Sequence, residues 1–377
     1  MTAVVDQFCG IGWGFACDEC GIDECGIDIE PTVELTRKSL GRTDNVCADI
    51  LNLDPMEWAG VDGLISSPPC QSWSRAGKGA GLDDPRGELV WQPLVWALAI
   101  RPRWVVCEQV PEARGAFELI AHRLREVGYH ATTYTLSAET LGVPQTRLRV
   151  FLAAHRDRPV DRPTLTHQRY RKGRPRVAPV DMLGHLPWVS MAEALSMDFD
   201  ELTTNQNGEL GAGRTERYAR SADAPAPTLT GNADRWKVDT RCNWMPEFDG
   251  EDRPSPTLTA VAGGKSQWTL RHIRGAGMAE RHGDRPDREL TEPSFGVTCG
   301  MYRRDYLVSD AERRPLTESQ GCALMSFPPG TAEHLQGTKA ERWKIIGNAV
   351  CPPVGRAVLA TVLDAEVDTS EKDQVTP

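Results

Sequence analysis

Residues 3–15 read Ala-Val-Val-Asp-Gln-Phe-Cys-Gly-Ile-Gly-Trp-Gly-Phe, a short apolar run followed at once by alternating glycines. The apolar run up to Asp6 is typical of a buried strand. Gly10, Gly12 and Gly14 predict a turn that lets the backbone approach a ligand at the start of a helix. The same arrangement opens the dinucleotide-binding oxidoreductases, so this stretch alone predicts a nucleotide-binding α/β fold and leaves the reaction open.

The alternation of strand and helix continues to about residue 155. Strands are predicted at 24–28, 45–48, 62–66, 104–108 and 149–153, and helices at 31–40, 87–100 and 112–127. Such alternation predicts a doubly wound, mostly parallel sheet. Ligands bind these sheets beyond the carboxyl ends of the strands, where Asp6, Asp28, Cys70 and Glu108 are expected.

A stiff loop is predicted at Ser67-Pro-Pro-Cys-Gln-Ser-Trp-Ser74, directly after an apolar run. The two prolines fix φ and remove two backbone donors, so this segment continues neither a strand nor a helix. A thiol presented on such a loop is well placed to act as a nucleophile. Taken alone, Cys70 is equally well explained as one buried thiol among 11 cysteines.

Composition and net charge limit the classes of function that the chain can have. The chain has 377 residues, 40% of them hydrophobic and 25% charged, which predicts a globular protein of two domains. We expect no membrane span, no secretory signal and a cytoplasmic location with free thiols. The net charge of −10 argues against a uniformly basic nucleic-acid binder but permits a local basic patch.

Three cysteines near the N-terminus have partly metal-like spacing. Cys17, Cys20 and Cys25 are separated by two and four residues. No second Cys or His pair at suitable spacing accompanies them, so we expect free thiols and no metal.

The composition and periodicity of the chain change after residue 155. Residues 156–176 are rich in arginine, and a weak repeat follows at 225–230, 254–259 and 293–298. This pattern predicts a small, irregular, β-rich second domain over 156–313. Its basic residues are candidates for phosphate contacts, although a solvated linker is the alternative. Alternation returns at Leu316, a closing helix is predicted at 353–367, and a frayed tail at 368–377.

Several motifs occur in an order that resembles the DNA cytosine-5 methyltransferases. They are Asp6-x-Phe-x-Gly10, Pro68-Pro-Cys-Gln-x-Trp-Ser74, Cys107-Glu-Gln-Val110, Gly142-Val-Pro-Gln-Thr-Arg-Leu-Arg149, Leu316-Thr-Glu-Ser-Gln320 with Met325-Ser-Phe-Pro-Pro329, and Gly347-Asn-Ala-Val350. The resemblance covers roughly residues 3–154 and 314–365. It implies a Rossmann-like methyltransferase domain over 1–155 and 314–367, with target recognition in 156–313.

The resemblance also implies a reaction. Cys70 adds to carbon 6 of a cytosine, carbon 5 then takes the methyl group of S-adenosylmethionine, and elimination gives 5-methylcytosine. Glu108 is expected against N3 and the exocyclic amine of the base. Arg147 and Arg149 are expected to hold the base and to favour the thiolate of Cys70.

The expected cofactor pocket follows from the same resemblance. Asp28 takes the ribose hydroxyls and Asp49 the adenine amine. The remaining residues expected around S-adenosylmethionine are Asp6, Phe8, Gly10, Gly12, Ile29, Ile50, Pro68, Asn348 and Ala349. Three residues depart from the family pattern, namely Trp13 for glycine, Trp73 for phenylalanine and Gln109 for asparagine.

The implied partner is double-stranded DNA, from which the target base must be flipped out. The glycine-rich segment 71–86 is expected to close over that base. Candidates for base readout are Asn205, Gln206, Asn232, Arg235, Arg271, Arg303 and Arg304. We expect a monomer, either part of a restriction-modification system, where a cognate endonuclease is encoded nearby, or a solitary host or phage enzyme.

The sequence also allows three alternatives. An RNA (tRNA) cytosine-5 methyltransferase shares the same core, but the long segment between Arg149 and Leu316 favours a DNA-reading domain. A nucleotide-binding oxidoreductase leaves the Pro-Pro-Cys loop unexplained. A catalytically inactive DNA-binding relative is disfavoured by the intact Cys70 and Glu108.

Overall fold

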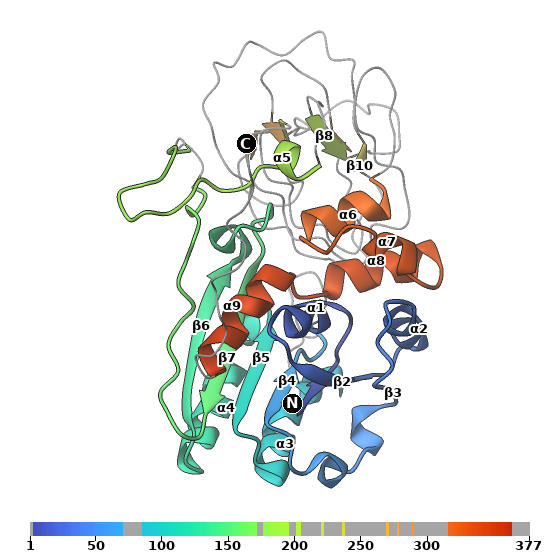
Figure 1. Ribbon diagram of the computed structural model, residues 1–377, viewed down its shortest axis with the longest axis vertical. Coiled ribbons are helices and arrows are strands. Elements are labelled where there is room, and N and C mark those ends of the chain that lie inside the picture. Colours follow the sequence, from blue (N-terminus) through green and yellow to red (C-terminus); the bar gives the residue numbers. More distant parts are fainter. Residues whose placement is uncertain are drawn as a thin grey trace, which may run out of the picture.

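A seven-stranded mixed sheet forms the centre of the computed structural model (Figure 1). The structure describes residues 3–70, 85–171, 176–195 and 316–363 and six short strands between 201 and 289. The strands of the sheet are β1 (Ala3–Gln7), β2 (Asp23–Asp28), β3 (Asn45–Cys47), β4 (Gly63–Ser66), β5 (Trp104–Gln109), β6 (His130–Ser137) and β7 (Leu148–His155). Their spatial order is β3-β2-β1-β4-β5-β7-β6. This agrees with a Rossmann-like methyltransferase fold.

One strand runs against the others. β7 is antiparallel to both β5 and β6, whereas the pairs among β3, β2, β1, β4 and β5 are parallel. The predicted strand at 149–153 is therefore present but reversed in direction, and the sheet is mostly rather than wholly parallel. Edge strand β6 is absent from the strands predicted from sequence.

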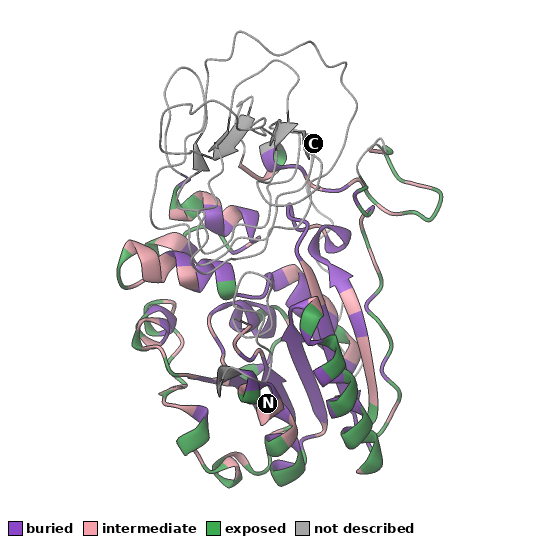
Figure 2. Cartoon of the chain, turned by 180° about the vertical axis from the view of Figure 1, so that it is seen from behind, coloured by how far each residue is buried: buried purple, intermediate pink, exposed green. Residues whose placement is uncertain are grey.

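Helices cover both faces of the sheet. They are α1 (Gly12–Glu19), α2 (Pro31–Ser39), α3 (Gln92–Ile100), α4 (Arg114–Glu126), α5 (Met191–Leu195), α6 (Glu318–Leu324), α7 (Thr331–His334), α8 (Lys339–Asn348) and α9 (Pro352–Val362). One core cluster joins α1, α8 and α9 to one face, and a second joins α3 and α4 to the other. Figure 2 shows the strands between them as buried and the outer faces of the helices as exposed.

Two predicted helices have different bounds in the structure. The segment 87–100 begins as a 3₁₀ turn, Pro85–Trp91, and becomes α-helical only at Gln92. Pro93 lacks a backbone donor, which suits it to the first turn of α3 and not to an interior position. The closing helix predicted at 353–367 is wrong at its end, because α9 stops at Val362 and Leu363 is already extended.

The C-terminal segment returns to the beginning of the chain. Helix α9 lies beside α1, and α8 leads into it (Figure 1). Residues 339–362 have the length and hydropathy of a membrane span, but 67% of the apolar window is buried in this core, and the backbone is extended between α8 and α9 at Ala349 and Cys351. The stretch is thus accounted for as two core helices.

Six short strands fall in the region predicted to be β-rich. β8 (Glu201–Thr204) pairs antiparallel with β9 (Arg220–Ser221), β10 (Trp236–Lys237) and β11 (Thr269–Leu270), and β12 (Gly277–Met278) pairs antiparallel with β13 (Arg288–Glu289). The domain boundaries at 155 and 314 stay predictions.

Gly12 allows the closest approach between the two ends of the chain. A Cβ atom on Gly12 would lie 2.1 Å from the carbonyl oxygen of Val350 and 2.7 Å from its nitrogen. We expect Gly12→Ala to destabilise the protein by about 1–3 kcal/mol, because backbone atoms must shift to accommodate the methyl group. The midpoint of urea unfolding measures this change.

Gly115→Ala in α4 is the matched control for that prediction. A Cβ on Gly115 would meet no atom within 4 Å, so alanine should leave the stability unchanged or raise it slightly. Equal unfolding midpoints for the two variants would contradict the assigned role of Gly12.

Candidate functional site

The predicted strand-end residues meet at one edge of the sheet. β4 ends at Ser66 and leads into Cys70, and Glu108 lies near the end of β5. Because β7 is antiparallel, it begins at this same edge, where Gln109 is paired with Val150. The reversal of β7 therefore brings Arg147 and Arg149 to the carboxyl end of β5.

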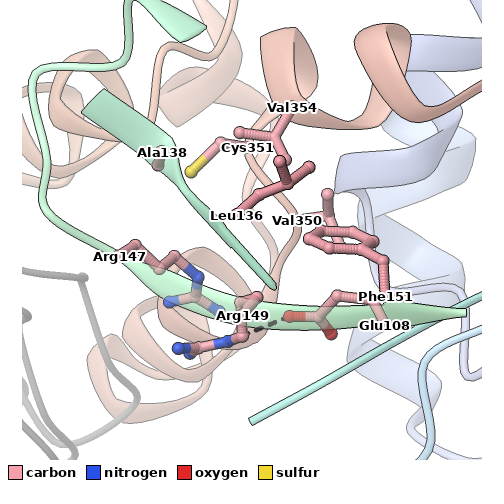
Figure 3. A pocket seen from close by; sticks show the side chains of 9 residues that line it. All are labelled: Glu108, Leu136, Ala138, Arg147, Arg149, Phe151, Val350, Cys351 and Val354. Carbon is pink, nitrogen blue, oxygen red and sulfur yellow. Dashed lines mark ion pairs between the residues drawn. The ribbon is translucent and has the colours of Figure 1, made fainter. Parts of the chain in front are cut away.

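A pocket opens between these strands and the C-terminal segment. Its walls are Glu108, Leu136, Ala138, Arg147, Arg149, Phe151, Val350, Cys351 and Val354. Figure 3 shows the carboxylate and both guanidinium groups on one side and the thiol of Cys351 on the other. Charged groups and an apolar wall thus share one opening.

Glu108 and Arg149 form an ion pair inside this pocket. The distance between Arg149 Nε and Glu108 Oε1 is 2.9 Å, and Glu108 is only 6% exposed (Figure 3). The buried Oε1 nonetheless makes no hydrogen bond of good geometry in the structure. The carboxyl group is held near a cation and keeps capacity to hydrogen-bond a ligand.

Arg147 joins the sheet edge to the C-terminal motif. Its side chain is buried, and Nη1 donates a hydrogen bond to the carbonyl oxygen of Gly347 at 3.0 Å. Burial and the neighbouring Arg149 together lower the pKa of Arg147 to about 10, against the opposing effect of Cys351, Glu108 and Cys70. The group is still a cation at neutral pH.

Cys70 is a partly exposed residue with a free thiol at the end of the Pro-Pro-Cys loop. Burial raises the pKa of this thiol above its ordinary value. The charge on Arg149 lowers that pKa, Glu108 raises it and Arg147 lowers it again. All three charged residues of the pocket therefore act on the thiol, and the two arginines favour the thiolate.

Two side chains hold the loop that carries Cys70. The amide Nε2 of Gln109 donates to the carbonyl oxygen of Pro68 at 2.7 Å, and Trp13 Nε1 donates to Ser67 Oγ at 2.7 Å. The backbone N–H of Ser67 also donates to the carbonyl oxygen of Gln7 at 3.1 Å. The departures from the family pattern at Trp13 and Gln109 are thus both contacts to this loop.

Asp28, at the end of β2, holds the glycine turn that follows β1. Its Oδ2 accepts from the backbone N–H of Gly10 at 3.2 Å, and its Oδ1 accepts from that of Glu30 at 3.0 Å. Burial raises the pKa of Asp28, and these two hydrogen bonds lower it. Ile29 next to it is 59% exposed, which leaves an apolar face open beside the carboxylate.

The other expected cofactor residues differ in their access to the surface. Phe8 and Gly10 both have positive φ, 56° and 49°, in the turn after β1. Asp49 caps a 3₁₀ turn by accepting from the backbone N–H of Leu51 at 3.0 Å. Asn348 is exposed, whereas Pro68, Ala349, Ile50 and Gly12 are buried. The side chain of Asn348 can thus contact a ligand directly, whereas most of the Ile50 side chain cannot.

Asp6 lies in the interior, below the glycine turn. It is 0% exposed, and burial together with Glu24 raises its pKa well above the ordinary value. Arg37, which is ion-paired with Glu24, donates to the carbonyl oxygen of Gly10 at 3.2 Å. Asp6 therefore faces the buried charges that support the turn.

Some arginines of the segment 156–176 make hydrogen bonds within the protein. Arg158 donates to the carbonyl oxygens of Thr361 and Leu363 at the end of α9, and Arg162 donates to that of Thr135 at 2.9 Å. Arg169 and Arg171 are exposed. Arg156 and Arg162 are exposed as well, but Arg162 is already bonded to the protein, so Arg156, Arg169 and Arg171 are the better candidates for phosphate contacts.

The early cysteines are spread over separate elements. Cys17 lies in α1, Cys20 ends it, and Cys25 lies in β2, all as free thiols. Within the described part of the chain, His, Cys, Asp and Glu form no group of three or more that could hold a metal ion.

Cys351 is a pocket residue that the sequence did not single out. It is 2% exposed, and burial raises its pKa to about 11. The only available signal was its position directly after the Gly-Asn-Ala-Val motif.

Several predicted features lie outside the described residues. They are most of the loop 71–86 with Trp73, the three repeats, the candidate base readers Asn205, Gln206, Asn232, Arg235, Arg271, Arg303 and Arg304, and the tail 368–377.

Comparison with known proteins places this arrangement in context. A model of the family described as C-5 cytosine-specific DNA methylase matches residues 4–364. Type II methyltransferase M.MthTI of Methanothermobacter thermautotrophicus is 34% identical over 28% of this chain and 36% of its own length. Type II methyltransferase M.NaeI of Lentzea aerocolonigenes is 26% identical over 90% of this chain and 70% of its own length.

The alignments with the first curated relatives span between 36% and 54% of those proteins. Among solved structures, a protein described as a DNA modification methyltransferase encoded within a prophage of E. coli superposes with a TM-score of 0.54. It covers 95% of this chain and 97% of its own, with 17% sequence identity, and so supports the fold alone.

Proposed function

The chain belongs to the C-5 cytosine-specific DNA methylase family, and from that premise we propose that it transfers the methyl group of S-adenosylmethionine to carbon 5 of cytosine in double-stranded DNA. The observation that carries this proposal is the position of Glu108 and Arg149, ion-paired at 2.9 Å and acting on the thiol of Cys70. A nucleophile, an acid and a cation at one sheet edge suit addition to an electron-poor ring.

Cys70 begins the reaction in this proposal. Carbon 5 of cytosine is a poor nucleophile, and addition of the Cys70 thiolate to carbon 6 makes it electron-rich. Carbon 5 then attacks the methyl donor, loses its proton to a base, and elimination releases the thiol. The cations of Arg149 and Arg147 lower the pKa of Cys70 and so raise the fraction of thiolate available for the first step.

Glu108 acts on the opposite edge of the base. Its carboxyl group, held as a carboxylate by the ion pair, takes a proton from solvent as the base binds and then donates it or a hydrogen bond to N3, which removes electron density from carbon 6 as the thiolate adds. The ion pair with Arg149 fixes the orientation of this carboxyl group. Arg147, tied to Gly347, holds the other side of the pocket in place.

The glycine turn fits S-adenosylmethionine, which supplies an activated methyl group when bound. A Cβ on Gly10 would meet no atom within 4 Å, so the space above the turn is open. Each oxygen of Asp28 accepts one backbone N–H and retains a lone pair for a ribose hydroxyl. The exposed Ile29 offers an apolar face to adenine, Asp49 an acceptor to its amine, and Asn348 closes the pocket.

The rest of the chain binds the flipped base and reads the DNA sequence around it. In this proposal residues 156–313 read the DNA, residues 71–86 close over the base, and Arg169 and Arg171 contact phosphates. The enzyme acts as a monomer in the cytoplasm.

The rate of addition should rise with pH. Burial raises the pKa of Cys70 above its ordinary value, so at neutral pH most of the thiol is protonated and inactive. Below that pKa the thiolate fraction grows about tenfold per pH unit, and the single-turnover rate of adduct formation should follow it between about pH 6 and pH 8. A rate independent of pH over this range would contradict thiolate formation as the controlling step.

Trapping on 5-fluorocytosine tests the proposed function. Duplexes carrying this base have no C5 proton to lose, so methyl transfer should leave the protein covalently attached to DNA. A library of duplex sequences supplies the substrate, and a denaturing gel detects the adduct. Absence of any adduct across the library would overturn the proposal.

Tritium transfer separates the two substrate classes. The protein is incubated with labelled S-adenosylmethionine and either duplex DNA or tRNA. Label is expected in DNA, and label only in tRNA would favour the RNA methyltransferase instead.

A further inference from the structure

Trp13 fills an interior position where the family pattern has glycine. It is 1% exposed, its ring meets the edge of Phe151 at a centroid distance of 6.5 Å, and a Cβ on Gly355 of α9 would lie 3.3 Å from it. The absence of a side chain at Gly355 is one reason that an indole fits here. Shape alone would be satisfied by any ring of similar size.

The indole N–H does more than fill space. It donates to Ser67 Oγ at 2.7 Å across 54 residues of sequence. Ser67 stands three residues before Cys70, and its own N–H is bound to Gln7. Since the intervening Pro68 and Pro69 have fixed φ, a restraint on Ser67 leaves few rotations by which Cys70 can move.

The contact also joins the two halves of the site. Trp13 lies in the first turn of α1, directly after the glycine turn proposed to hold the methyl donor, whereas Ser67 belongs to the loop of the nucleophile. A fixed distance between these two segments fixes the separation of donor and nucleophile. Misplacement by about 1 Å is enough to cost about a hundredfold in rate.

We propose that the hydrogen bond from Trp13 to Ser67 sets the position of Cys70 relative to the methyl donor, so that Trp13 is a positioning residue of the reaction. This inference rests on the proposed function, because it assigns Cys70 the role of nucleophile. It predicts that loss of the hydrogen bond lowers the rate of covalent addition and spares the affinity for the cofactor.

Trp13→Phe and Ser67→Ala test the inference in the full chain. Each removes one partner of the hydrogen bond, and each should slow adduct formation with 5-fluorocytosine duplexes about ten- to a hundredfold. The dissociation constant for S-adenosylmethionine should stay within about threefold of wild type. Ser67→Thr keeps the hydroxyl and should recover most of the rate, and the double variant should be no slower than the slower single one.

Trp343→Phe is the matched control. Trp343 is a fully buried indole of α8 whose Nε1 has no hydrogen-bond partner in the structure. Its replacement should change thermal stability as Trp13→Phe does but leave the rate of adduct formation unchanged. If Trp13→Phe fails to fold, Ser67→Ala against Ser67→Thr decides the question.

The outcomes are distinguishable from failure of the proposed function. If wild-type protein forms the adduct and both Trp13→Phe and Ser67→Ala form it at the wild-type rate, the positioning role is overturned and the methyltransferase assignment stands. If wild type forms no adduct, both fail. If cofactor affinity falls in parallel with the rate, Trp13 is structural and the inference is overturned.

Discussion

Cys70→Ala is expected to lower methyl transfer to DNA by at least about 10⁴-fold and to abolish covalent trapping by 5-fluorocytosine. Alanine leaves the loop geometry intact, because the prolines and the contacts at Ser67 and Pro68 remain. It removes only the sulfur that adds to carbon 6, and loss of a covalent nucleophile has effects of this size in other enzymes. Tritium transfer and the denaturing gel measure the two losses.

Binding should survive the same substitution. The dissociation constants for S-adenosylmethionine and for duplex DNA are expected within about threefold of wild type, because Asp28 and the DNA-reading region are untouched. Cys20→Ala is the control, since Cys20 is a partly buried free thiol at the far end of α1. An adduct that persists in the Cys70 variant would assign the nucleophile to another residue.

The strand ends were predictable from sequence because burial leaves a local signature. The apolar runs of β1, β4 and β5 are continuous and end at polar residues, as buried parallel strands do. Edge strand β6 has no continuous apolar run and carries instead the signature of a half-buried strand, with threonines alternating with Tyr134 and Leu136. The direction of β7 has no local signature, since the same side chains are buried in either direction.

The residue types of the site were predictable, but their contacts were not. The motif series led to the family, which is confirmed by the match over residues 4–364. The hydrogen bonds from Trp13 to Ser67 and from Gln109 to Pro68 join residues 54 and 41 positions apart. They depend on the register of the sheet and on the space left by the missing side chain at Gly355. No single segment of the sequence determines either of these.

Glu108→Gln is expected to reduce methyl transfer about 10²- to 10⁴-fold, the usual range for loss of a general acid. Glutamine keeps the size of the side chain and an oxygen facing Arg149, but it has no acidic proton to give to N3. Tritium transfer to duplex DNA measures the loss. Glu118→Gln on the exposed face of α4 is the control and should be neutral, because its ion pair with Arg114 is exposed.

Reactivity of the thiol separates the acid role of Glu108 from a role in activating Cys70. The negative charge of Glu108 raises the pKa of Cys70, whereas Arg149 lowers it. Glu108→Gln should therefore lower that pKa and make Cys70 react with iodoacetamide at least as fast as wild type at neutral pH, even though methyl transfer is slow. Arg149→Met should have the opposite effect on alkylation, since it removes a cation that favours the thiolate. If Glu108→Gln slowed alkylation as much as methyl transfer, Glu108 would act through the thiol, and the proton given to N3 would need another source.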